Sequence, residues 1–155
     1  MRTSSMTGLL RLRTERDTAV KLLLFYAHDY WLRPFEKSVP EAPDHSDEMT
    51  ARDAVVALVH VEAADPAEHA KLVTKAIKQI KWLAGKFATR RIVLHSFAHL
   101  AATRATPAEA EALLDDARAR LVASDFEVQM TPFGYFNEFR LHVAGPSLAK
   151  VFVEL

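Results

Sequence analysis

The pattern x-Pro-Ala-Glu occurs twice in this chain, at Asp65-Pro66-Ala67-Glu68 and at Thr106-Pro107-Ala108-Glu109. Aspartate and threonine are good N-cap residues, and proline is favoured in the first turn of a helix. A glutamate three residues after the cap can complete a capping box. Each pattern therefore predicts a helix start. Because an apolar, strand-like run precedes each one, the two patterns favour folds in which strands and helices alternate.

Apolar residues follow each predicted start at helical spacing. The first set, which predicts a helix from 66 to about 86, is Val73, Ile77, Ile80, Leu83 and Phe87. The second set is Ala110, Leu113, Leu114, Ala117 and Leu121. Both sets place their members on one helix face, as expected for helices that pack on a core.

Five segments have the pattern of strands: 19–27, 53–63, 90–96, 125–130 and 138–143. The segment 28–48 between the first two contains three prolines and several acids, which predicts an excursion or hairpin-like loop. The resulting order, β-β-α-β-α-β-β, predicts an α/β or α+β fold in which two main helices cover a mixed sheet. No repeat or linker divides the chain. We therefore expect one domain over residues 19–155, behind a variable N-terminal extension of residues 1–18.

Composition excludes several classes of protein. The 155 residues are 50% hydrophobic and 26% charged, which is ordinary for a globular domain. No apolar run approaches the ~18 residues of a membrane-spanning helix. The chain has no cysteine, which excludes disulfides, thiolate nucleophiles and cysteine zinc sites. We expect a cytoplasmic protein with no membrane partner.

The formal net charge is zero, but the charges are unevenly distributed. Between Glu68 and Glu109 there is no acidic residue, and on the first predicted helix Lys71, Lys75 and Lys78 lie opposite the apolar face. This lysine stripe is compatible with a nucleic-acid partner and equally with a solvated helix face.

Common catalytic signatures are missing: the chain has no G-x-S-x-G motif, no glycine loop for phosphates and no dinucleotide fingerprint. His95 and His99 are four residues apart, a spacing that can bind a metal on a helix. A strand-to-loop transition does not hold that geometry, and no third ligand is evident, so we expect no metal and no cofactor.

Two separated segments carry a family resemblance. "SFAHLA" (96–101) follows a predicted strand, and "DFEVQMTPFGYFNEFRLHVAGPSLAKVF" (125–152) comes later. Together they resemble the N-terminal editing domain of archaeal threonyl-tRNA synthetases, in which P-F-A-H-L precedes A-P-F-G-[YW]-Y-K-A-F and then K-G-H-P-L-x-E. "VKLLLFYAHDY" (20–30) and "VALVHVEAADP" (56–66) are similar to the first two strands of that family.

The resemblance implies a D-aminoacyl-tRNA deacylase-like fold, a homodimer, a tRNA partner and hydrolysis of serine mischarged on threonine tRNA. Since no aminoacylation domain follows, we expect a freestanding trans-editing factor that does not charge tRNA itself. The chemistry needs no protein nucleophile, because an aminoacyl ester is already activated. A positioned water and hydrogen-bond donors for the developing oxyanion are sufficient.

The resemblance also implies the site residues. His99 and Asn137 are the candidate catalytic residues, facing one pocket with the backbone of residues 96–98. The candidate substrate-binding residues are Ser96, Phe97, Ala98, His28, Asp29, Phe133, Gly134, Tyr135, Phe136 and Lys150. His28 and Asp29 are placed at the end of the first predicted strand. Lys71, Lys75 and Lys78 are the candidate tRNA-binding residues.

Several positions depart from the family pattern. The family Tyr-Lys pair falls on Phe136 and Asn137, its C-terminal glutamate on Lys150, and its proline before F-A-H on Ser96. Lys150 is a candidate source of the charge lost at Asn137. Three hypotheses stay open: a deacylase for seryl-tRNA, a deacylase for D-aminoacyl-tRNA or another small amino acid, and a catalytically inactive relative that binds aminoacyl-tRNA or a protein.

Overall fold

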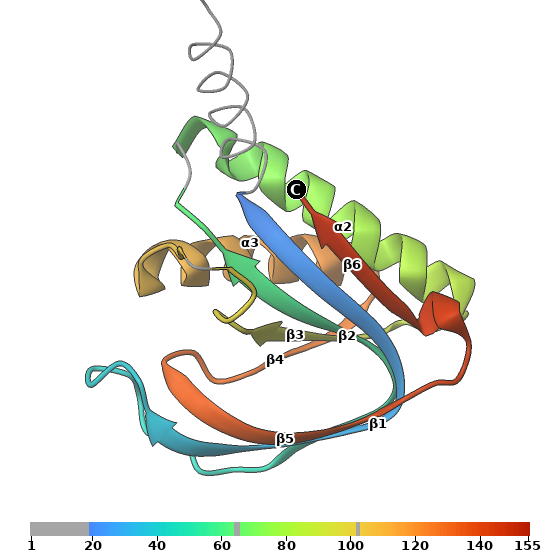
Figure 1. The fold of residues 1–155 in the computed structure, drawn as a ribbon, viewed down its shortest axis with the longest axis horizontal. Helices are drawn as coiled ribbons and strands as arrows, with labels where there is room; N and C mark the ends of the chain where they lie inside the picture. The colour runs from blue at the N-terminus through green and yellow to red at the C-terminus, as the bar shows by residue number, and fades with distance from the viewer. Residues whose placement is uncertain (1–18, 64–65, 102) are drawn as a thin grey trace, which may run out of the picture.

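The structure, a computed structural model, describes residues 19–63, 66–101 and 103–155 (Figure 1). The predicted N-terminal extension, residues 1–18, lies outside the described residues. In chain order the elements are β1 (Val20–Lys37), β2 (Met49–Val61), the 3₁₀ turn η1 (Pro66–Glu68), α2 (His69–Lys86), β3 (Arg91–Ser96), α3 (Pro107–Ala123), β4 (Glu127–Met130), β5 (Tyr135–Val143), the 3₁₀ turn η2 (Ser147–Ala149) and β6 (Lys150–Glu154). The predicted order is confirmed, with β6 added at its end.

The strands form one mixed sheet in the order β4-β3-β2-β1-β5, and β6 also pairs with β1. The β2–β3 and β3–β4 pairs are parallel, so α2 and α3 are the crossovers that parallel neighbours require. β1 is antiparallel to β2, β5 and β6. It is so long that β6 and β5 share one of its edges, β6 along residues 21–25 and β5 along residues 27–37.

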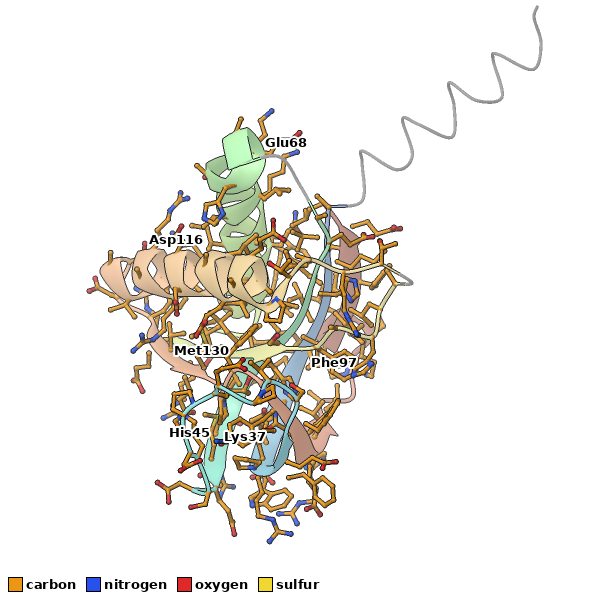
Figure 2. All side chains as sticks on the ribbon, turned by 90° about the vertical axis from the view of Figure 1, so that its left-hand side faces the viewer. Lys37, His45, Glu68, Phe97, Asp116 and Met130 are labelled. Carbon is orange, nitrogen blue, oxygen red and sulfur yellow. The ribbon has the colours of Figure 1, made fainter. Side chains whose placement is uncertain are left out.

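The sheet bends strongly, so that the part containing β5 turns away from the part beside the helices (Figure 1). The main core lies between the sheet and both helices, with Leu22, Leu24, Ile80, Leu83 and Leu121 almost fully buried. A second core lies on the other face of the sheet, where the bent part of β1 and β5 folds back over β2 and β3. Figure 2 shows Lys37 and His45 at the far end of this bent part, opposite Glu68 at the start of α2.

The two predicted helix starts have different outcomes. At α3 the prediction is confirmed in detail: the Thr106 side chain accepts from the Glu109 amide, the Glu109 carboxylate accepts from the Thr106 amide, and Pro107 is the first helical residue. At the first start, Pro66–Glu68 forms a 3₁₀ turn and the α-helix begins only at His69. Glu68 occupies the N-cap position without a side-chain cap hydrogen bond, and the predicted cap Asp65 lies outside the described residues. No helix in the described ranges is long and apolar enough to cross a membrane.

The predicted loop over 28–48 is wrong for residues 28–37, which continue β1. β1 bulges between Ala27 and Asp29 and again between Pro34 and Glu36, and these bulges interrupt the alternation that would have indicated a strand. Pro34 is tolerated because pairing with β2 ends at Leu32, so its missing N–H removes no hydrogen bond on that side. His28 and Asp29 therefore lie in the interior of β1 rather than at its end.

Candidate functional site

The segments that carry the predicted site residues meet at a partly open cavity of about 270 Å³. This is slightly below the ~300–1,000 Å³ of typical small-molecule sites. Three connections form it: the start of the β1–β2 connection, the β3–α3 loop and the β4–β5 loop. Its lining residues are Ser38, Val39, Val59, Val61, Ser96, Ala98, His99, Arg104, Ala105, Pro107, Ala110, Pro132, Phe133, Gly134, Tyr135 and Phe136.

Seven of the predicted site residues line this cavity, although they come from two segments far apart in the sequence. They are Ser96, Ala98, His99, Phe133, Gly134, Tyr135 and Phe136. The cavity is small and largely apolar, with valine and alanine side chains on the walls contributed by β2 and α3. Such a volume can hold the aminoacyl end of a substrate but not a macromolecule.

The loop that carries His99 is fixed to the end of β2. The Phe97 amide donates to the Val59 carbonyl at 2.9 Å, and the Ala105 amide donates to the Val61 carbonyl at 2.7 Å. Between these two points the buried imidazole of His60 binds the loop twice, because its Nδ1 accepts from the Leu100 amide at 3.2 Å and its Nε2 bonds the Thr103 carbonyl at 2.7 Å. Nδ1 can accept only when it carries no proton, so His60 is neutral with its hydrogen on Nε2.

Glu62, the residue directly after β2, holds the same loop. Its carboxylate accepts from the Thr103 hydroxyl at 2.6 Å and pairs with the Lys21 ammonium at 2.6 Å. Burial raises the pKa of the Glu62 carboxyl, but the hydrogen bonds from Lys21 and Thr103 outweigh burial and hold the pKa below its ordinary value. The carboxylate is therefore ionised at neutral pH and anchors Thr103 by charge-assisted hydrogen bonding.

The second site segment depends on Gly134. Its φ is +82°, and a Cβ at this position would lie 2.9 Å from the Ala42 Cβ, so only glycine fits. The Gly134 carbonyl accepts from the Ser38 and Val39 amides at 2.8 and 3.2 Å. The Tyr135 hydroxyl donates to the Pro43 carbonyl at 2.7 Å and accepts from the His45 amide at 2.9 Å. The P-F-G-Y segment is thus joined to the β1–β2 connection, which closes one side of the cavity.

His99 and His95 occupy different environments. His99 is exposed at the cavity, and its ring lies edge-on to Phe97 with 4.9 Å between ring centroids. It makes no hydrogen bond to any described residue. His95 is buried in the second core, where its Nδ1 and the Tyr30 hydroxyl are hydrogen-bonded at 3.0 Å, and burial lowers its pKa to about 4. His95 is therefore part of the second core, whereas His99 lies at the cavity.

Five predicted site residues do not line the cavity. Phe97, which is labelled in Figure 2, packs in the second core beside His95 and Phe139. His28 lies within β1, with its Nδ1 3.6 Å from Asp53 Oδ1, and Asp29 pairs with Arg52 and His142.

Asn137 and Lys150 lie apart from each other. Asn137 pairs with Pro34 and lies on the same inward face of β5 as Tyr135. Its side-chain Oδ1 is buried and has no hydrogen-bond partner in the described part of the chain. Lys150 pairs with Phe25, near the other end of β1, and its ammonium donates to the carbonyls of residues 144, 145 and 146. The structure therefore contradicts the idea that Lys150 supplies the charge lost at Asn137.

The residues that form the walls of the cavity were not predicted from the sequence, and neither was Arg104, a charged residue that also lines it. The walls are core-type residues of β2 and α3 whose sequence pattern indicates only burial. Arg104 lies in the stretch without acids and directly before the capped start of α3, so its position in the sequence could have indicated it.

Larger hollows lie at the other end of the sheet, around Asp53, Arg91 and Glu127, with volumes of about 530 and 390 Å³. They are shallow and open to solvent, and both are lined by charges of both signs. None of the residues of the F-A-H-L (97–100) and P-F-G-Y (132–135) segments lines them. We regard the smaller cavity as the candidate site because residues of both the F-A-H-L and the P-F-G-Y segments line it.

Comparison with known proteins identifies the family of this chain. Residues 20–155 match the family described as the archaea-specific editing domain of threonyl-tRNA synthetase. A threonine–tRNA ligase of Hyperthermus butylicus is 32% identical over 138 residues, covering 85% of this chain and 22% of the ligase. One of Nitrosopumilus maritimus is 31% identical over 133 residues, covering 84% of this chain and 21% of the ligase. The chain thus spans about a fifth of the length of these relatives.

A solved structure named c-Myc DNA Unwinding Element Binding Protein is similar with a TM-score of 0.60 at 11% identity, over 87% of this chain and 98% of that one. At this identity the similarity shows the fold alone. The fold is the predicted D-aminoacyl-tRNA deacylase-like one, an α+β arrangement of a mixed sheet and two helices. On the family match over residues 20–155, the chain belongs to the archaea-specific editing domains of threonyl-tRNA synthetases.

Proposed function

We propose that this chain hydrolyses the ester bond of mischarged aminoacyl-tRNA, with seryl-tRNA(Thr) as the first candidate substrate. The observation that carries the proposal is the convergence of the two family segments on one small cavity. The reaction takes place in trans: the aminoacyl end of a separately charged tRNA enters the cavity. Water adds to the carbonyl carbon, the ester bond breaks, and the products are the free amino acid and the ribose hydroxyl of the tRNA.

Water is the proposed nucleophile, because no lining hydroxyl is activated. Ser96 and Ser38 line the cavity, but neither side chain is hydrogen-bonded to a histidine or a carboxylate of the described residues. The Tyr135 hydroxyl is engaged by Pro43 and His45. An activated nucleophile would need a neighbouring base in hydrogen-bond contact.

The main chain of the FAHL segment offers the oxyanion donors. The amides of Phe97 and Leu100 donate to Val59 and His60, whereas those of Ala98 and His99 donate to no described residue. We assign Ala98 and His99 as the donors for the developing negative charge, and the exposed His99 imidazole as the group that orients the substrate. Because the loop is fixed to β2, these donors need little rearrangement when the substrate binds.

The test is a deacylation panel with seryl-tRNA(Thr), threonyl-tRNA(Thr) and D-aminoacyl-tRNA. The wild type is expected to hydrolyse seryl-tRNA fastest, and His99→Ala to lower kcat/KM by about 10²-fold through lost orientation. The melting temperature should change little, because His99 is exposed. His142→Ala, an exposed histidine on the outer face of β5, is the matched control and should keep wild-type activity.

The panel also separates the alternatives. A preference for D-aminoacyl-tRNA or another small aminoacyl group would assign a different substrate, and this result is favoured by the loss of the family lysine at Asn137. No hydrolysis of any ester would reject the enzyme and leave a tRNA-binding relative.

A further inference from the structure

Among the described residues that line the cavity, Arg104 is the only one with a permanently charged side chain. The lining residues in the described part of the chain include no aspartate and no glutamate, and the other ionisable side chains there are His99 and Tyr135. Arg104 is exposed, and no acidic side chain among the described residues forms a salt bridge with it. Within the described part of the chain, the positive charge that Arg104 brings to the cavity is therefore not paired with an acidic side chain.

The backbone at Arg104 is held on both sides. The residue before it is Thr103, whose carbonyl is hydrogen-bonded to His60 Nε2 and whose hydroxyl donates to the Glu62 carboxylate. On the residue after it, the Ala105 amide donates to the Val61 carbonyl at 2.7 Å. Loop residues normally move more than strands, but this one is anchored directly to β2. The backbone of Arg104 is therefore fixed beside the cavity that its side chain lines.

The substrate limits what this cation can bind. The amino group of an aminoacyl ester is itself basic, so a guanidinium repels it. The nearest anion in an aminoacyl-tRNA is the phosphate attached to the 5′ side of the same terminal ribose that carries the ester. Arginine binds phosphate with two parallel hydrogen bonds and always keeps its charge.

We propose that Arg104 binds the 5′-phosphate of the 3′-terminal adenosine and so fixes the depth at which the aminoacyl ribose enters the cavity. This proposal deepens the proposed function and rests on it for the identity of the substrate. Neither Asn137, which carries no charge, nor Lys150, whose ammonium is held by three carbonyls of residues 144–146, can take this role.

Two pairs of small probes isolate the phosphate. The first pair consists of the seryl ester of adenosine and the seryl ester of adenosine 5′-monophosphate, which differ only in that group. With the phosphorylated ester, Arg104→Gln should raise KM about 10- to 100-fold with little change in kcat, as expected for a lost charge-assisted hydrogen bond. With the unphosphorylated ester the variant should match the wild type. Arg104→Lys should restore part of the loss.

The second pair needs no hydrolysis. Adenosine 5′-monophosphate should bind the wild type more tightly than adenosine does, and Arg104→Gln should abolish that preference. Arg118→Gln removes the same charge from an exposed position of α3 outside the cavity and should keep the preference.

The outcomes separate the two proposals. Equal losses with both esters, or no preference of the wild type for the phosphorylated nucleoside, would overturn the role of Arg104. A wild type that binds the phosphorylated nucleoside through Arg104 but hydrolyses no ester would support the phosphate site and reject the deacylase.

Discussion

Two histidines four residues apart differ because a strand ends between them. His95 is on β3, where alternation turns it into the second core, and His99 is on the following loop, where it reaches the cavity. The sequence could predict that the "SFAHL" and "PFGY" segments meet, because the family resemblance joins them. The one signal for Arg104 was its position in the stretch without acids, because no strand or helix periodicity places a loop side chain. The sequence could not predict that Lys150 would be bound by the carbonyls of residues 144–146.

The low pKa of His95 makes the stability of the fold dependent on pH. Burial lowers this pKa from 6.5 to about 4, so the unfolded state binds a proton at a pH where the folded state does not. Above pH 6.5 His95 is neutral in both states and does not reduce the unfolding free energy. As the pH falls from 6.5 towards 4, the unfolded state takes up a proton that the folded state does not, and the unfolding free energy decreases.

His95→Asn keeps an acceptor for Tyr30 but does not titrate. Between pH 7 and pH 4.5 we expect the wild type to lose about 2 kcal/mol more unfolding free energy than this variant, measured by urea denaturation at both pH values. Glu62 also titrates near the acid end, but it does so in both proteins. His142→Asn, an exposed control, should follow the wild type. Equal pH dependence of the wild type and His95→Asn would show that folding does not lower the pKa of His95.

At the scale of elements, prediction from the sequence worked where the signal was local. The capping box of α3 and the apolar faces of both helices were predicted correctly, since these patterns concern residues within a few positions of each other. The length of β1 and the existence of β6 were not predicted. β1 contains two bulges and Pro34, and β6 is a short edge strand held by pairing with residues 21–25, a contact that no local pattern reports.

Substitutions in the lysine stripe of α2 can test whether this helix contacts tRNA. Lys71, Lys75 and Lys78 are exposed, as predicted, and α2 buries its opposite face. If they contact phosphates, Lys75→Glu with Lys78→Glu should weaken tRNA binding strongly at low salt and much less at high salt. The slope of log K against log salt should fall by about 2.

The control for the lysine pair is Arg118→Glu with Arg120→Glu, which makes the same charge change on exposed positions of α3. Binding would be measured by fluorescence anisotropy across a salt series. If both pairs weaken binding equally, the effect is one of net charge, and α2 is not a contact surface.

At the scale of the whole molecule, the sheet is covered unevenly. The helices cover one face, and the bent part with β5 covers only a part of the other. Beside β6, Leu23 and Phe25 of β1 lie on this second face, and Phe152 of β6, the partner of Leu23, is 52% exposed. Sheets that lack a second layer leave apolar surface in water, and such a patch favours association.

We expect a second copy of the chain to cover this face, since the family resemblance also implies a homodimer. Phe152→Ser should then shift the protein from dimer to monomer in light scattering at micromolar concentration. The matched control is Val122→Ser on α3, which is 50% exposed but lies on the helix layer, and it should stay dimeric. A wild-type monomer would rule out the dimer. A dimer that survives Phe152→Ser would place the interface on another face, because removing a central aromatic side chain from an interface usually costs enough free energy to dissociate it at this concentration.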